Sequence, residues 1–187
     1  MATTYYFRVA DFYISVSLPS TCNIEKLLPS FRPFAVSDCN GEKLLLKLSA
    51  VSSDRMPHAD DGELIEESDN DMGHLVLYRL ADGYYIDIFD KGSRHGMYAT
   101  SDFSSVEVCV RWDNHNAGNA LTSLIRVAYA QAILSHAAVS IHASAVFRDG
   151  MAYLFMGRSG TGKSTIINWL MAHKELRLAF SISCTSR

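Results

Sequence analysis

The chain has 187 residues, of which 48% are hydrophobic and 20% are charged, and its formal net charge is −3. This composition is typical of a globular protein and argues against the strongly basic face that nucleic-acid binding needs. No apolar run approaches the roughly 20 residues of a membrane-spanning helix, and the N-terminus lacks a signal-peptide pattern. We therefore expect a soluble cytoplasmic protein that binds neither nucleic acid nor membrane.

The four cysteines are widely separated, and none forms the paired Cys or Cys/His spacing of a zinc site: Cys22, Cys39, Cys109 and Cys184. We interpret them as thiols in a reducing compartment.

Residues 1–113 are predicted to form a strand-rich region. "TYYFRVADFYISVSL" (4–18) predicts one or two strands with a break near Ala10 and Asp11, and residues 24–28 predict a short helical turn. Before Pro33 we expect extended chain. Further strands are expected at 43–51, 63–70, 74–80, 83–90, 96–101 and 105–112, with a hairpin turn at "LADG" (80–83). The pattern predicts a mostly antiparallel sheet.

Eight of the 20 acidic residues fall between positions 54 and 71. Their spacing does not match a calcium-binding loop. We interpret this segment as a solvated loop followed by an exposed strand face.

Residues 114–138 carry apolar side chains at helical spacing, at positions 121, 124, 125, 128, 132 and 133. They predict the longest helix of the chain, which either Asn116 or Asn119 caps. The fold class is α/β (α+β), with a strand-rich region at 1–113. The second region, 114–187, contains this helix and the beginning of a P-loop domain.

"MGRSGTGKST" (156–165) has the form Gly-x-x-x-x-Gly-Lys-Ser of a phosphate-binding loop. A strand is expected at 139–147, then an apolar strand at 151–156 that is buried on both faces, and a helix at 163–174. Between the last two, backbone N–H groups and the helix N-terminus can hold an anion. The predicted nucleotide-binding residues are Gly157, Arg158, Ser159, Gly160, Thr161, Gly162, Lys163, Ser164 and Thr165.

Two side chains of this loop have specific predicted roles. Lys163 places a positive charge on the β- and γ-phosphates, and the Ser164 hydroxyl is a ligand for Mg²⁺. Because the chain has no Asn-Lys-x-Asp guanine signature, we expect ATP rather than GTP.

"SIHASAVFRDGMAYLFMGRSGTGKST" (140–165) resembles the HPr serine kinase/phosphorylase family and its relatives of the phosphoenolpyruvate-carboxykinase type. The resemblance implies a kinase that uses ATP and Mg²⁺ and transfers a phosphoryl group to a Ser/Thr or small-molecule hydroxyl. It also implies that His142, which precedes the loop, lies close to the phosphates and assists catalysis together with Lys163. The alternative is that His142 is simply a strand residue packed beside the loop.

The chain departs from this family after the loop, where the family has acidic residues on the next strand. No Asp or Glu follows Glu175. Three explanations of this departure are open. The chain is a truncated gene product whose last residues are read out of frame, a fragment of a longer protein, or a naturally minimal protein. The first explanation fits best. We expect weak nucleotide binding, little or no turnover, and self-association through exposed sheet edges.

The leading hypothesis is therefore an HPr-kinase-like protein that binds ATP. The alternative is a non-catalytic binding module that contacts a partner protein through the acidic segment 54–71. A GTPase or transporter ATPase ranks lowest, because no second acidic motif or base-recognition motif is visible.

Overall fold

The computed structural model describes residues 1–53, 56, 62–70, 73–90, 92–141, 143–148, 151–157, 161–162, 165 and 177–178. The chain divides into two compact units, Met1–Ala138 (unit 1) and Val139–Arg187 (unit 2). The sequence-based boundary between 113 and 114 lies earlier, and it separates the long helix from the sheet that it covers.

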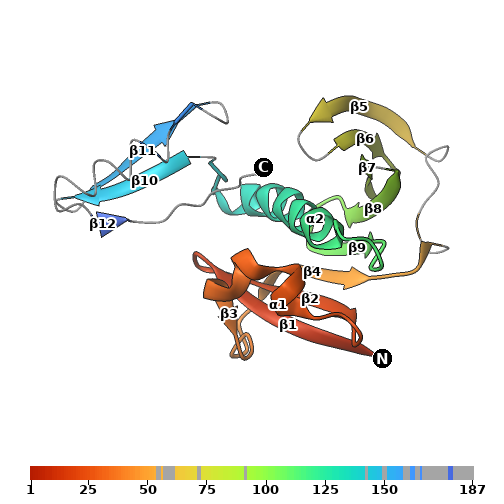
Figure 1. Cartoon of the computed structure of the whole chain (residues 1–187), viewed down its shortest axis with the longest axis horizontal. Helices are drawn as coiled ribbons and strands as arrows, with labels where there is room; N and C mark the ends of the chain where they lie inside the picture. The colour runs from red at the N-terminus through yellow and green to blue at the C-terminus, as the bar shows by residue number, and fades with distance from the viewer. Residues whose placement is uncertain are drawn as a thin grey trace. The chain divides into compact units, whose positions relative to one another are not determined.

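Unit 1 is built on a nine-stranded sheet with the order β3-β1-β2-β4-β9-β8-β7-β6-β5 (Figure 1). Alternating apolar and polar residues separated by short turns account for most of these strands. Their bounds are β1 Ala2–Val9, β2 Phe12–Pro19, β3 Ala35–Val36, β4 Leu44–Ala50, β5 Glu63–Asn70, β6 Gly73–Arg79, β7 Gly83–Asp90, β8 Ser93–Thr100 and β9 Ser105–Cys109.

The sheet is mostly antiparallel, as predicted, but not along its whole width: six of its eight strand pairs are antiparallel and two are parallel. Strands β5 to β9 form an antiparallel meander, and β1 and β2 form a hairpin across the predicted break at Ala10 and Asp11. Strand β4, however, lies between β2 and β9 and is parallel to both. Parallel neighbouring strands need long connections, so no local turn sequence predicts their pairing.

The hydrophobic core lies between one face of this sheet and helix α2 (Ala117–Ala132). The helix packs against β4, β8, β9 and the short helix α1 (Ile24–Leu27) (Figure 1). The central strands contribute completely buried side chains from their alternate positions, among them Ile14, Val16, Leu46, Leu48, Met97, Val106 and Val108, and the helix contributes Leu121, Leu124 and Ile125. This burial supplies the main driving force for folding of unit 1.

The remaining helical elements of unit 1 are short. Helix α1 (Ile24–Leu27) is capped by Asn23, whose side chain accepts a hydrogen bond from the backbone N–H of Lys26. The 3-10 helix η1 (Pro29–Phe34) follows, so the expectation of extended chain before Pro33 was wrong. The fixed φ of proline is also compatible with a 3-10 turn.

The long predicted helix is present, with Asn116 rather than Asn119 at its N-cap position. The side chain of Asn116 makes no capping hydrogen bond. After Ala132 the helix tightens into the 3-10 helix η4 (Ile133–His136), and Ala137 ends it in the left-handed conformation with φ 54° and ψ 29°.

Unit 2 contains a three-stranded sheet with the order β11-β10-β12. The strands are β10 (Ala143–Arg148), β11 (Met151–Met156) and β12 (Arg177–Leu178). The predicted burial of β11 on both faces was wrong, because four of its side chains are exposed: Met151, Tyr153, Leu154 and Met156. Among the described strands, β11 lies at an edge of this sheet and pairs with β10 alone.

Within the described part of the chain, no helix is long and apolar enough to cross a membrane.

Candidate functional site

The glycine-rich segment follows strand β11 directly. Strand β11 pairs with β10 along its whole length, from Arg148 opposite Met151 to Ala143 opposite Met156. This antiparallel hairpin holds the strand up to the point where the chain enters Gly157. Beyond the loop, Thr165 has helical backbone geometry. The described residues thus place Gly157 directly after a strand and give Thr165 helical backbone geometry, whereas residues 158–160, 163 and 164 lie outside the described part of the chain.

Gly162 has a backbone conformation that favours glycine. Its φ is +81°, in the left-handed region. A Cβ placed there would meet no heavy atom within 4 Å. The requirement for glycine therefore comes from the backbone angle and not from crowding. Thr161 and Thr165, on either side of Gly162 along the chain, are both exposed, so this part of the loop is accessible to a ligand.

Several predicted site residues lie outside the described residues: His142, Arg158, Ser159, Gly160, Lys163 and Ser164. Their predicted roles therefore stay predictions. Among the residues that are described, no group of three or more His, Cys, Asp or Glu side chains is placed to hold a metal ion.

Unit 1 contains a charged cluster that the sequence analysis missed. The Asp87 carboxylate on β7 is 3% exposed and lies against the guanidinium of Arg94 on β8. Arg94 donates from Nε to Oδ1 at 2.9 Å and from Nη2 to Oδ2 at 2.6 Å. The Tyr85 hydroxyl donates a further hydrogen bond to Oδ1 at 2.9 Å. These three donors compensate the cost of burying a carboxylate.

The pKa values in this cluster follow from its geometry. Burial of the phenol raises the pKa of Tyr85 to about 12, and the neighbouring Asp87 carboxylate adds to the rise. The hydrogen bond to Asp87 raises the pKa of the Arg94 guanidinium above its ordinary value. Near neutral pH, Tyr85 is therefore a neutral donor and Arg94 a cation.

A sequence signal for this cluster exists in "GYYIDIFD" (83–90). In a strand, Tyr85 and Asp87 lie on the same face, and an Asp flanked by apolar residues needs a partner when it is buried. Arg94 comes from the next strand and is not opposite Asp87, which pairs with Gly96. Its position diagonal to Asp87 is therefore not evident from the spacing along the chain.

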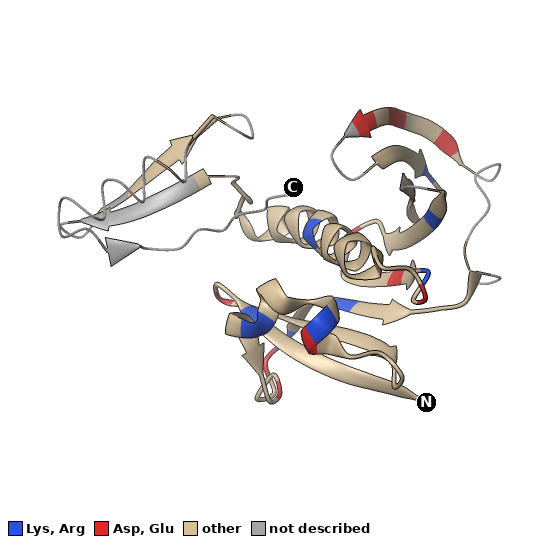
Figure 2. Cartoon of the chain, in the orientation of Figure 1, with Lys and Arg blue, Asp and Glu red and all other residues tan. Residues whose placement is uncertain are grey.

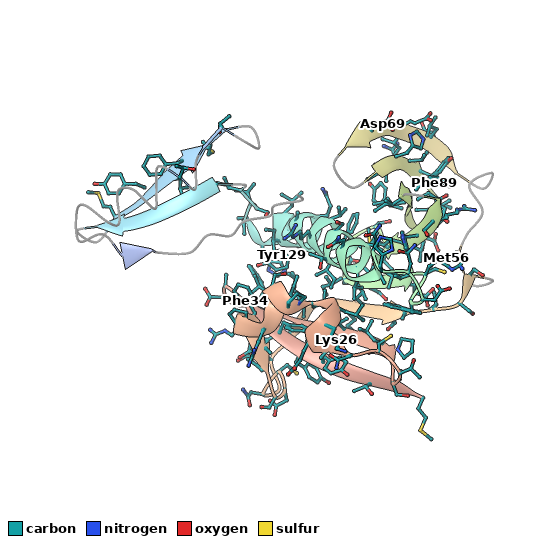
Figure 3. All side chains as sticks on the ribbon, viewed as in Figure 1. Lys26, Phe34, Met56, Asp69, Phe89 and Tyr129 are labelled. Carbon is teal, nitrogen blue, oxygen red and sulfur yellow. The ribbon has the colours of Figure 1, made fainter. Side chains whose placement is uncertain are left out.

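A row of side chains continues outward from this cluster across four strands. Asp69, His74, Phe89 and Arg94 occupy successive paired positions on β5, β6, β7 and β8. The Arg94 guanidinium lies 5.7 Å from the centre of the Phe89 ring, and His74 lies 3.1 Å from Asp69. Figure 3 labels Asp69 and Phe89 in this part of the sheet. The row links neighbouring strands through contacts between side chains.

The acidic strand β5 is an exposed edge strand, as predicted for the second half of the acidic segment (Figure 2). Arg79 on β6 compensates part of this charge, because its guanidinium lies 3.4 Å from Glu63, and His74 on β6 lies 3.1 Å from Glu67. The preceding half of the segment lies mostly outside the described residues.

Comparison with known proteins gives one short similarity. Guanylate kinases from two strains of Bacteroides fragilis are 68% identical to this chain over 39 residues, which is 21% of this chain and 19% of each kinase. The chain thus spans about a fifth of the length of the curated relatives that it matches. A segment of this chain therefore resembles part of a kinase.

The similarity does not extend further. No protein-family profile matches the chain. No solved structure matches it either.

Proposed function

We propose that residues 157–165 bind the phosphates of ATP together with Mg²⁺, in the manner of a P-loop kinase. The observation that carries this proposal is the Gly-x-x-x-x-Gly-Lys-Ser sequence placed directly after strand β11. The left-handed Gly162 and the helical Thr165 support it, because a phosphate-binding nest needs both an unusual backbone turn and a following helix N-terminus.

The chemistry of two side chains fits this ligand. A lysine ammonium at position 163 compensates the charge of the β- and γ-phosphates, and a serine hydroxyl at position 164 is an oxygen ligand of the kind that Mg²⁺ prefers. Magnesium, when bound, neutralises charge on the transferring phosphoryl group.

The phosphoryl acceptor belongs to one of two classes. The short similarity to guanylate kinases supports guanylate as the acceptor. The resemblance of residues 140–165 to the HPr serine kinase/phosphorylase family supports a hydroxyl acceptor, with His142 beside the phosphates. Incubation with labelled Mg·ATP and either guanylate or a hydroxyl-bearing protein distinguishes them by the identity of the labelled product.

Competition binding tests whether the loop recognises the phosphate groups of the nucleotide. A fluorescent ATP analogue is titrated into the full chain with Mg²⁺ and then displaced by inorganic tripolyphosphate or by adenosine. We expect tripolyphosphate to displace the analogue and adenosine to be ineffective, since the loop contacts the phosphate groups. Displacement by adenosine alone would place the binding energy in the base and would contradict the proposal.

A second candidate function is protein binding by unit 1 without catalysis. The exposed strand β5 favours it, because an edge strand can pair with an extended segment of another protein. Glu66, which is exposed on β5, is a suitable probe. If β5 is the contact surface, the Glu66→Lys variant no longer captures a partner that the native chain captures. If β5 is not the contact surface, the two proteins capture the partner equally.

A further inference from the structure

We infer that unit 1 is a self-standing folding module, joined to the loop-bearing unit by a hinge at residues 139–141. The described core residues of unit 1 all precede this segment. Aromatic contacts and a hydrogen bond hold the last helix of unit 1 against the sheet of the same unit. Residues 139–141 themselves belong to no helix or strand.

The described core of unit 1 is built from unit 1 itself. Among the residues that the structure describes, its buried hydrophobic cluster begins at Phe7 and ends at Ile133, so each described buried member comes from the first 138 residues. The helix α2 and strands from both ends of this unit, β2 and β9, all contribute to it. Because hydrophobic burial is the dominant stabilising term, a cluster closed in this way can support folding by itself.

The C-terminal end of α2 is fastened to the β1–β2 hairpin by aromatic contacts. The Phe12 ring lies edge-on to Tyr129, with 6.4 Å between the ring centres, and edge-on to His136 at 5.2 Å. The Tyr129 hydroxyl also donates a hydrogen bond of 3.1 Å to the backbone oxygen of Val9. These contacts fix the end of the helix to the sheet that it covers.

Backbone hydrogen bonds close the helix end just before the boundary. Ala137 turns into the left-handed conformation, and its N–H donates to the Leu134 oxygen at 3.2 Å. The N–H of Ala138 then donates to the oxygen of the buried Ile133 at 3.3 Å. This pattern terminates a helix and satisfies its last carbonyl groups. Ala138 is therefore the last residue that closes the helix end of unit 1 with such a backbone hydrogen bond.

The segment after Ala138 has the properties of a connection. Residues 139–141 have no regular secondary structure, and β10 begins only at Ala143. Val139 is 68% exposed and Ile141 is 39% exposed although both are hydrophobic. Backbone that has little burial and no strand or helix hydrogen bonding opens at low free-energy cost. The geometry thus assigns the hinge to these three residues.

Matched insertions in the full chain test the hinge. In a Trp169→Phe background, Trp112 is the single tryptophan, and its partly buried ring packs against the core of unit 1. Its fluorescence therefore reports unfolding of unit 1 in urea. Gly-Ser-Gly-Ser is inserted after Val139 in one variant and after Ser135 in the other.

We expect the insertion after Val139 to leave the urea midpoint within about 0.1 M of the background protein, and the insertion after Ser135 to lower it by roughly 0.5 M or more. The second insertion displaces His136 from Phe12 and breaks the hydrogen bonds that close the helix. Equal loss in both variants would overturn the hinge, because unit 1 would then depend on the chain beyond it. No loss in either variant would overturn the assigned boundary.

Discussion

The guanidinium of Arg94 donates two hydrogen bonds, of 2.9 and 2.6 Å, to the buried carboxylate of Asp87. Removing Arg94 would leave that carboxylate buried with a single donor in the cluster, the Tyr85 hydroxyl. We expect Arg94→Leu to lower the free energy of unfolding by about 2 kcal/mol, less than for a fully buried pair because the Arg94 side chain is 57% exposed. Urea denaturation measures it.

Arg79→Leu is a matched control for this substitution. The Arg79 side chain is also 57% exposed, but its partner Glu63 is 70% exposed. Surface ion pairs contribute little, so we expect a change of less than about 0.5 kcal/mol. Equal effects of the two substitutions would show that burial of Asp87 does not determine the strength of its pair.

Gly118 near the start of α2 touches helix α1 through its backbone. A Cβ at this position would lie 2.7 Å from the backbone oxygen of Leu27, which is closer than real Cβ contacts. We expect Gly118→Ala to destabilise unit 1 by about 1–2 kcal/mol, because α1 must shift. Thermal unfolding followed by circular dichroism measures the loss.

Asn119→Ala, at the next position, is the control for Gly118→Ala. Asn119 is exposed and lies inside the helix, and alanine is the better helix former. We expect no loss of stability. A clear loss would indicate that Asn119 caps the helix, which was the alternative left open by the sequence.

Ala137 occupies the left-handed region with φ 54°. A side chain is strained there, and glycine is not, so we expect Ala137→Gly to raise the free energy of unfolding by about 0.5–1 kcal/mol. The same substitution at Ala130, within α2, should lower stability by about 1 kcal/mol. Urea midpoints that fall in both variants would argue against a left-handed end of the helix at Ala137.

Asp102 stabilises the turn between β8 and β9 in a pH-dependent way. Its carboxylate accepts hydrogen bonds from the Ser104 backbone and from the hydroxyls of Thr100 and Ser104, and these lower its pKa. A lowered pKa in the folded state contributes stability above the unfolded value of about 3.9, and this contribution is lost as the pH falls through the folded value.

We therefore expect Asp102→Asn to be less stable than the native protein at pH 7 and to approach it in stability as the pH falls through the folded pKa of Asp102. Unfolding midpoints at a series of pH values measure the difference. Glu66→Gln on the exposed strand β5 serves as a control, with a small effect across the range. A loss of stability for Asp102→Asn that is equally large at every pH would contradict the assigned cause.

Much of the secondary structure could be predicted from the sequence, because alternation and turn residues are local signals. The predicted strands 83–90 and 151–156 match β7 and β11 in their bounds. The position of β4 between β2 and β9 could not be predicted in this way, since it depends on packing between distant segments. The packing of α2 on the sheet could not be predicted in this way either. A fragment of residues 1–113 would lack this helix.

For the candidate site, the glycine-rich loop could be recognised because its spacing reflects a backbone requirement, as at Gly162. The exposure of β11 could not be predicted, because an apolar strand has the same sequence pattern whether or not other elements cover it. Asp87 and Arg94 were missed for a related reason, since a diagonal contact between strands depends on register as well as sequence.

Calorimetric titration with Mg·ATP tests the central claim most directly. We expect the native chain to bind, Lys163→Ala to bind at least about tenfold more weakly, and Lys174→Ala, which lies outside the loop motif, to bind within about twofold of the native chain. Equal affinity of the native chain and Lys163→Ala, or no binding by the native chain, would contradict a phosphate-binding role for residues 157–165.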